Sequence, residues 1–225
     1  MKNIVIIPVR GGSKRLPNKN GKLLGGIPLF VHSINYAKQN LDICHKIVVS
    51  TDDAMLKEIA LKEGVFVVDR PKELSGDFVP TKDVLKHALA QETTAYNAVI
   101  LLQSTNPFRP KELLKDAFAV FLKEASDSLM TVSISDKKLG KIVLNKFIPF
   151  NYEFGQRSQD MDSLFYENGL LYITKASNIE NGEIIGANNY PYIENHPLAK
   201  IDIDTQEDFE LAAYYYQQYK TNNKQ

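Results

Sequence analysis

Apolar runs alternate with amphipathic segments along most of the chain, and this alternation restricts the folds that it can adopt. Runs with few polar residues predict buried strands at residues 3–9, 45–50, 65–68, 98–102 and 129–134. Segments of helical period separate them, at residues 29–38, 53–63, 82–91 and 111–124. Strands that are apolar on both faces must be covered on both faces. The sequence therefore predicts an α/β fold of three layers with a doubly wound, mostly parallel sheet.

The first predicted strand runs directly into a glycine pair flanked by cationic side chains. The loop carries Arg10, Gly11, Gly12, Ser13, Lys14, Arg15, Lys19 and Asn20. Paired glycines allow backbone dihedrals closed to other residues and bring N–H groups close to a ligand, while the cations supply charge for phosphate oxygens. The spacing is neither that of a Walker loop nor that of the three-glycine dinucleotide motif. We therefore expect a polyphosphate site of another kind, at the carboxyl end of the sheet.

Two aspartates near the C-terminus, Asp202 and Asp204, alternate with Ile201 and Ile203. If this segment is a strand, the isoleucines point into the core and both carboxylates project from the other face. Adjacent carboxylates repel each other, and a Mg²⁺ ion shared between them and substrate phosphates would stabilise them. A magnesium site is therefore one interpretation of this segment.

A second interpretation of this segment is structural. Thr205 and Asp208 have the spacing of a capping box, so residues 204–208 could simply begin the next helix. Both interpretations can hold at once, because the cap leaves Asp202 without a structural role.

Composition is typical of a compact enzyme and argues against several other classes. The chain has 225 residues, of which 44% are hydrophobic, enough for one domain over residues 1–225. Lysine plus arginine and aspartate plus glutamate balance at 27 each, so we expect no nucleic-acid or membrane partner. Cys44 is the only cysteine, which excludes disulfides within the chain. No run of about 18 apolar residues and no signal-peptide core occurs, so we expect a cytoplasmic protein.

The segment from Ser135 to Leu164 departs from the α/β alternation. It is too long for an ordinary connection and lacks a clear helical period. Among its apolar side chains are those of Ile142, Val143, Phe147, Ile148, Phe150, Tyr152 and Phe154. So many apolar side chains predict that the segment packs against something. One possibility is a small subdomain or hairpin that packs on its own chain.

Five motifs follow one another along the chain, and together they resemble one family. They are Ile6 to Asn20, Ser50 to Asp53, Leu101 to Arg109, Asn168 to Ile173 and Asp202 to Thr205. In this order they are similar to the motifs of the cytidylyltransferases that activate sialic acids and related nine-carbon sugar acids. One such motif would be weak, whereas five collinear motifs are specific.

The resemblance implies which residues bind the nucleotide CTP. These are Arg10, Gly11, Gly12, Ser13, Lys14, Lys19, Asn20, Arg70 and Thr81. Arg10 and Lys14 are best placed to stabilise the leaving pyrophosphate, and Arg70 and Thr81 would lie at the cytidine end. Judged from the residues alone, Arg70 could also be a surface ion-pair partner.

The resemblance also implies contacts to the sugar acid, from Gln103, Lys141, Arg157 and Asn168. The resemblance further implies a homodimer in which residues 135–168 form a dimerisation arm. Lys141 and Arg157 of this arm face the partner's substrate, so that the active sites are shared. The residues alone leave two alternatives open: Gln103 could be a satisfied core amide, and Asn168-Gly169 a tight hairpin turn.

The predicted reaction is transfer of CMP from CTP to the anomeric hydroxyl of a sialic-acid-type sugar, with release of pyrophosphate. Such chemistry depends on positioning and charge stabilisation, so Arg10, Lys14, Asp202 and Asp204 are the predicted catalytic residues, with Mg²⁺ on the two aspartates. Ile184 and Ile185 stand where sialic-acid enzymes often have aromatics, which leaves sialic, legionaminic and pseudaminic acids open as substrates.

Two other functions remain to be weighed. A nucleotide-binding regulator without turnover is disfavoured by the paired aspartates and the complete basic loop. A nucleotidylyltransferase that uses UTP or GTP with a neutral sugar phosphate is disfavoured by the Asn168-Gly169 and Asp202-Ile203-Asp204 motifs.

Overall fold

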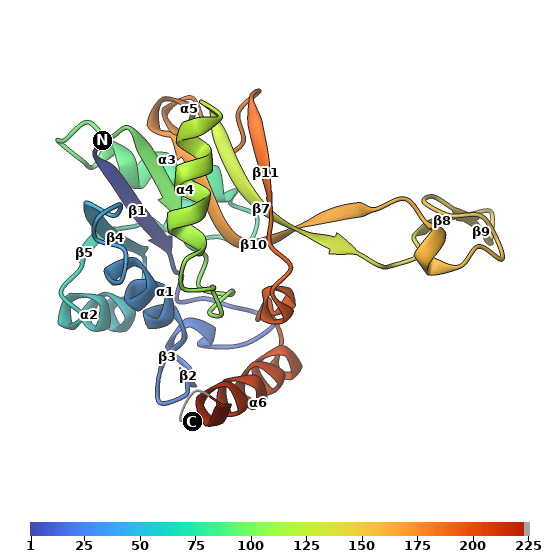
Figure 1. Cartoon of the computed structure of the whole chain (residues 1–225). Coiled ribbons are helices and arrows are strands. Elements are labelled where there is room, and N and C mark those ends of the chain that lie inside the picture. Colours follow the sequence, from blue (N-terminus) through green and yellow to red (C-terminus); the bar gives the residue numbers. More distant parts are fainter. Residues whose placement is uncertain (223–225) are drawn as a thin grey trace.

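The computed structural model describes residues 1–222, and its centre is a seven-stranded sheet (Figure 1). The strand order is β11-β7-β10-β6-β1-β4-β5. The strands are β1 (Asn3–Pro8), β4 (Lys46–Thr51), β5 (Phe66–Asp69), β6 (Ala98–Leu101), β7 (Ser128–Ser135), β10 (Leu164–Lys175) and β11 (Asn189–Ile193). Only β10 runs antiparallel to its neighbours, β6 and β7. The expectation of a mostly parallel sheet is therefore confirmed.

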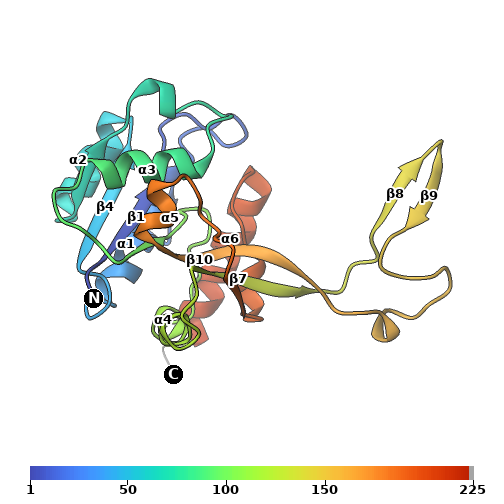
Figure 2. The same ribbon diagram turned by 90° about the horizontal axis from the view of Figure 1, so that it is seen from above.

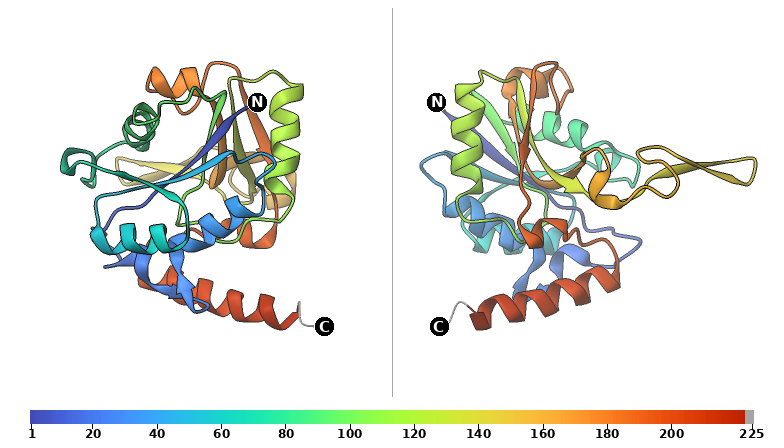
Figure 3. Two further views of the ribbon diagram at one scale, coloured as in Figure 1. Left: turned by 90° about the vertical axis from the view of Figure 1, so that its left-hand side faces the viewer. Right: turned by 45° about the vertical axis from the view of Figure 1, so that its right-hand side comes forward.

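Helices cover both faces of this sheet (Figures 2 and 3). On one face lie α1 (Leu29–Lys38), α2 (Ala54–Lys62) and α4 (Leu113–Lys123), and on the other α3 (Thr81–Ala90) and α5 (Ala176–Glu180). The alternation along β1 explains this arrangement, because Val5 and Ile7 belong to the first hydrophobic cluster whereas Ile4 and Ile6 belong to the second. The three-layer, doubly wound α/β fold is confirmed.

A third hydrophobic cluster joins the glycine loop to the C-terminal part of the chain. It contains Leu16, Leu24, Leu29, Leu198, Ile201, Ile203 and Ala212. The elements around it are η1 (Lys19–Gly21), β2 (Leu23–Leu24), β3 (Ile27–Pro28), η4 (Pro197–Lys200) and α6 (Gln206–Asn222). By burying side chains from both ends of the chain, this cluster brings the loop after β1 next to the segment before α6. In the part of the chain that the structure describes, no helix is long and apolar enough to cross a membrane.

The segment between Ser135 and Leu164 projects away from the sheet as an arm (Figures 1 and 2). It contains a hairpin of β8 (Gly140–Val143) and β9 (Lys146–Pro149), followed by η3 (Ser158–Asp160). Three of its aromatic rings, those of Phe147, Tyr152 and Phe154, contact one another. Other apolar side chains remain open to solvent, and Ile142 and Leu144 are 78% and 91% exposed. The predicted hairpin is therefore present, but it does not bury the apolar side chains on its own chain.

Candidate active site

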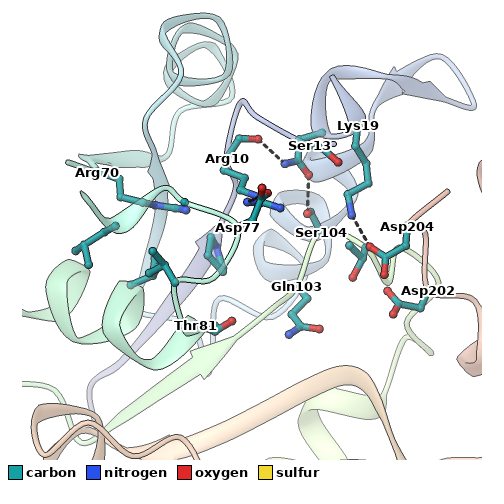
Figure 4. Close-up of a pocket in the computed structure, with 17 residues that line it drawn as sticks. Arg10, Ser13, Lys19, Arg70, Asp77, Thr81, Gln103, Ser104, Asp202 and Asp204 are labelled. Atoms are coloured by element: carbon teal, nitrogen blue, oxygen red, sulfur yellow. Dashed lines mark hydrogen bonds and ion pairs between the residues drawn. The ribbon is translucent and has the colours of Figure 1, made fainter. Parts of the chain in front are cut away.

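A cavity of about 340 Å³ lies at the carboxyl ends of three parallel strands; we call it the main cavity (Figure 4). Pro8 ends β1, Arg70 follows β5 and Gln103 follows β6, and all three line the cavity. Open parallel sheets bind their ligands at this edge. Of the residues predicted from the sequence, the cavity is lined by Arg10, Ser13, Lys19, Asn20, Arg70, Thr81, Gln103, Asp202 and Asp204. The fold therefore brings most of the predicted site together.

Gly11 permits close packing, and neither glycine of the pair adopts an unusual backbone conformation. Neither Gly11 nor Gly12 has a positive φ, so the expectation that they need dihedrals closed to other residues is wrong. A Cβ atom on Gly11 would lie 2.5 Å from Oδ2 of Asp53, the N-cap of α2. The Gly11 amide donates to Oδ1 of Asp52 at 3.1 Å. Neither glycine lines the main cavity, and Gly11 packs against Asp53 at the start of α2.

Asn20 fixes the shape of the glycine loop. Its Nδ2 donates to the carbonyl oxygen of Arg10 at 2.9 Å, and its Oδ1 accepts from Oγ of Ser104 at 2.7 Å (Figure 4). These bonds tie the loop to the segment after β6. The amide nitrogen and the amide oxygen of Asn20 thus both bond to protein groups. Asn20 therefore acts by positioning Arg10.

The cations of the loop are divided between two acidic residues. Arg10 and Lys14 each place a nitrogen 2.6 Å from a carboxylate oxygen of Asp77. Lys19 places its Nζ 2.9 Å from Oδ1 of Asp204 (Figure 4). The hydrogen bonds from Lys14 and Arg10 hold the pKa of Asp77 below its ordinary value. Lys14 is itself 81% exposed and does not line the main cavity, so its predicted phosphate contact requires its side chain to leave Asp77.

The aspartate pair lies on an extended segment that is not a strand of the sheet. Ile201 and Ile203 are buried, whereas Asp202 and Asp204 line the main cavity, so the predicted alternation is present. One backbone hydrogen bond, from Ile203 N to the carbonyl oxygen of Thr105 at 2.9 Å, holds the segment against the chain after β6. The strand on which the alternation was made conditional is absent, although the alternation itself is present.

The predicted capping box is also present, so both interpretations of this segment hold. Oγ1 of Thr205 accepts from the amide of Asp208 at 3.2 Å. Oδ2 of Asp208 accepts from the amides of Thr205 and Asp204, at 2.8 and 3.0 Å. The cap uses neither the Asp202 nor the Asp204 carboxylate, and the Asp204 carboxylate pairs instead with Arg15 and Lys19.

The charges around the aspartate pair fit a divalent cation that takes further ligands from a substrate. Partial desolvation and the nearby charge of Asp204 raise the pKa of Asp202, and a bound cation would offset both effects. The described residues contain no cluster of three or more histidine, cysteine or acidic side chains that could hold a metal ion. Magnesium needs no such cluster, since it binds through one or two carboxylates together with phosphates and waters.

Arg70 is buried and is not the surface ion-pair partner that the sequence allowed. Its Nε donates to Oγ of Ser50 at 3.2 Å and its Nη2 to the carbonyl oxygen of Val9 at 3.1 Å. Desolvation lowers the pKa of Arg70 to about 10. Arg70 and Thr81, the first residue of α3, lie on the opposite side of the main cavity from Asp202 and Asp204 (Figure 4). Arg70 thus ties together the ends of β1 and β4 while lining the cavity.

A second cavity, of about 400 Å³, adjoins the first and shares Gln103 and Asp202 with it. Its other lining residues are Tyr166, Glu167, Asn168, Gly169, Tyr172, Ala199 and Lys200. Lys200 is the one lysine or arginine among them. Glu167 accepts a hydrogen bond from the Tyr172 hydroxyl at 3.0 Å. The two cavities meet at Gln103 and Asp202, which is therefore the place where two bound substrates would touch.

Asn168-Gly169 forms an irregularity inside β10 and not a hairpin turn. The pairing register of β10 with β7 shifts between Glu167 and Tyr172. Gly169 has a φ of 74°, and a Cβ atom there would lie 2.9 Å from Oε1 of Gln103. The Asn168 side chain is buried and donates to Oγ of Ser133 at 2.9 Å. The irregularity thus lets the backbone pass close to Gln103 at the wall of the second cavity.

The arm residues Lys141 and Arg157 do not reach either cavity within one chain. Lys141 lies in β8, at the far end of the projecting arm (Figure 1). Arg157 precedes η3 and pairs with Asp160 at 2.8 Å. Neither lines the two cavities described above. Their predicted substrate contacts therefore require a second copy of the chain.

The structure adds Asp77 and Lys200 to the site. Asp77 stands in a loop without a sequence motif that marks it, so only its pairing with Arg10 and Lys14 reveals it. Lys200 directly precedes the Ile201 to Thr205 segment. A lysine beside a predicted ligand-binding motif is a signal by which it could have been found from the sequence. Ile184 and Ile185 pack against the second hydrophobic cluster and line neither cavity.

Comparisons with known proteins identify relatives that match most of this chain. The chain is 33% identical over 219 residues to an N-acylneuraminate cytidylyltransferase of Streptococcus agalactiae, covering 93% of this chain and 52% of that protein. It is 32% identical over 228 residues to a pseudaminic acid cytidylyltransferase of Campylobacter jejuni, covering 96% and 97%. The chain thus spans about half the length of the streptococcal relative.

A solved structure shares the fold at low sequence identity. A CMP:2-keto-3-deoxy-manno-octonic acid synthetase complexed with CTP superimposes with a TM-score of 0.73 at 16% identity, covering 97% of this chain and all of that one. The sequence profile of the family described as cytidylyltransferase matches residues 4–223. The chain therefore belongs to the cytidylyltransferase family.

Proposed function

We propose that the protein transfers CMP from CTP to the anomeric hydroxyl of a nine-carbon sialic-acid-type sugar acid and releases pyrophosphate. The observation that carries this proposal is the main cavity, which places Arg10 and Lys19 in one space with Asp202 and Asp204. Phosphate-binding cations and paired carboxylates are the groups that nucleotidyl transfer requires. The names of the relatives support CTP and a sugar acid of this class as substrates.

The residues of the main cavity have separate tasks in this reaction. Arg10 and Lys19, together with Lys14 once its side chain leaves Asp77, stabilise the charge that develops on pyrophosphate. Asp202 and Asp204 would hold Mg²⁺, which supplies positive charge at the α-phosphate when it is bound. Gln103 and Asp202, shared by both cavities, place the sugar hydroxyl next to the nucleotide.

The second cavity suits the sugar acid. The anomeric carbon of such a sugar carries both the attacking hydroxyl and the carboxylate, so the carboxylate must lie close to the junction of the two cavities. Lys200 lines the second cavity and, among the residues that the structure describes, pairs with no carboxylate. We assign it to the sugar carboxylate. Asn168, held by Ser133, forms part of the wall beside the sugar.

The identity of the sugar has a second candidate. N-acylneuraminate is the substrate named for the streptococcal relative, which this chain matches over 52% of its length. The pseudaminic acid enzyme of Campylobacter matches over 97% of its length. A CMP-pseudaminate or CMP-legionaminate synthase is therefore the alternative.

The test is pyrophosphate release in a matrix of four nucleoside triphosphates against sialic, legionaminic and pseudaminic acids. The proposal predicts release with CTP and one class of nonulosonic acid. Release of pyrophosphate with UTP or GTP, or with a neutral sugar phosphate, would instead indicate another kind of nucleotidylyltransferase. CTP binding without any release of pyrophosphate would support a regulator.

We further propose a cytoplasmic homodimer whose arms complete the partner's active site. The support is the arm itself, which exposes Ile142, Leu144, Phe150 and Phe154 in a single chain. A twofold interface is the commonest way to bury such a surface. Sedimentation at micromolar concentration tests the assembly, and a monomer would contradict it.

A further inference from the structure

One carboxylate holds two of the three cations that the proposed function assigns to pyrophosphate. Oδ1 of Asp77 lies 2.6 Å from Nη1 of Arg10, and Oδ2 lies 2.6 Å from Nζ of Lys14. Asp77 thus presents two anionic oxygens to two cations, as a phosphate group would. Asp77 and Arg10 both line the main cavity, so their ion pair lies inside the site.

The segment that carries Asp77 has few other attachments. Between Gly76 and Val79 the recorded backbone hydrogen bond is the one from Val79 N to the carbonyl oxygen of Gly76, at 3.3 Å. Phe78, the next residue after Asp77, is 96% exposed. The segment connects η2 (Lys72–Leu74) to α3 and is not part of the sheet. Asp77 can therefore leave Arg10 and Lys14 without disturbing the core.

We propose that Asp77 is an internal counter-ion of the phosphate site, which pairs with Arg10 and Lys14 in the free protein, gives way to the phosphates of CTP, and pairs with both cations again as pyrophosphate leaves. The inference rests on the proposed use of CTP. Asp77 and the phosphates compete for the same cations, so the free energy of the two ion pairs is subtracted from phosphate binding. CTP and pyrophosphate then bind more weakly, and pyrophosphate leaves faster, than Arg10 and Lys14 alone would allow.

The test is the affinity for inorganic pyrophosphate, measured by calorimetry without a sugar acid. Asp77→Asn keeps the size of the side chain and removes its charge. If Asp77 occupies the cations about nine-tenths of the time, the variant binds pyrophosphate about tenfold more tightly than the wild type. Asp77→Glu, which keeps the charge, stays close to the wild type. Asp69→Asn is the matched control, because Asp69 pairs with Lys57 at 2.7 Å on the surface, outside both cavities.

A purely structural role for Asp77 predicts different results. If Asp77 only held Arg10 and Lys14 in position, Asp77→Asn would weaken pyrophosphate binding, and this result or an unchanged affinity would overturn the proposal. Equal unfolding temperatures of wild type and variant exclude misfolding as the cause. In turnover, the KM for CTP and kcat should both fall, since release of pyrophosphate becomes slower.

Failure of the counter-ion proposal can be distinguished from failure of the proposed function. If pyrophosphate binds but no turnover occurs, the binding data still decide the counter-ion role of Asp77, and the proposed transferase activity is contradicted. Normal turnover together with weaker pyrophosphate binding in Asp77→Asn would overturn the counter-ion role of Asp77 and leave the proposed transferase activity standing. Absence of binding in both proteins would contradict the counter-ion and the phosphate site together.

Discussion

Lys19 and Asp204 are 185 positions apart in the sequence, and Nζ of Lys19 lies 2.9 Å from Oδ1 of Asp204. Lys19 also donates to the carbonyl oxygen of Ile203 at 3.0 Å, and its side chain is only 11% exposed. This contact fixes the distance between the proposed phosphate cations and the proposed metal carboxylates. Arg15 reaches the other oxygen of Asp204 at 2.7 Å, so the loop after β1 holds both oxygens of this carboxylate.

Asp204→Asn should nearly abolish turnover while the protein stays folded. One carboxylate cannot hold and orient a divalent cation as two can, so we expect a loss on the order of a hundredfold or more. Steady-state pyrophosphate release measures the effect, circular dichroism verifies the fold, and Asp69→Asn serves as the control. Full activity of the variant, or turnover of the wild type in excess chelator, would contradict the metal assignment.

Thr205→Ala should destabilise the protein without removing a group from the site. The substitution deletes the oxygen that accepts from the Asp208 amide at the start of α6, and loss of such a cap costs about 1 kcal/mol. Urea unfolding measures the change, and Thr93→Ala, at an exposed position before β6, is the control. Equal stability of the two variants would show that the cap contributes nothing.

Lys200→Gln should raise the KM for the sugar acid about tenfold, because a charge-assisted hydrogen bond to the carboxylate is lost. The KM for CTP should not change. Lys115→Gln, at an exposed position on α4, is the control. The decisive comparison uses a sugar analogue with an amide in place of the carboxylate, with which wild type and variant should perform alike. If the KM for the sugar acid rose in Lys141→Gln and not in Lys200→Gln, and only when the sugar has its carboxylate, the carboxylate contact would come from the arm.

Mixing two inactive variants tests whether the active sites are shared. Arg157→Ala removes the predicted arm contact and Asp204→Asn the predicted metal ligand. If the arm of one protomer completes the site of the other, heterodimers carry one intact site and recover part of the activity. Dimers that exchange subunits without recovering activity would reject the shared site but not the dimer.

Local sequence signals predicted the elements that depend on local chemistry. The period of apolar residues placed α1 at Leu29–Lys38, where the structure has it. The Thr205 and Asp208 spacing predicted a cap that is present. The carboxyl end of β1 was the expected location of the site, and the main cavity lies there. These features follow from side-chain periodicity, capping and the geometry of parallel sheets.

Features that depend on contacts between distant segments could not be predicted in this way. Arg109 is buried because it donates to the carbonyl oxygens of Leu170 and Gln103, both at 2.6 Å, and Arg70 is buried for a similar reason. A sequence shows the cations but not the carbonyl oxygens that the fold brings to them. The role of Gly11 likewise depends on Asp53, which reaches the loop only through the pairing of β1 with β4.

Mass spectrometry of the products formed from CTP and a panel of nonulosonic acids tests the proposed CMP transfer directly. With Mg²⁺ present, we expect one CMP-sugar and one pyrophosphate for each CTP consumed. We expect both products to be lost in Asp204→Asn. Conversion of CTP to CMP or CDP without a sugar nucleotide, or an equal yield from UTP, would contradict the proposed CMP transfer.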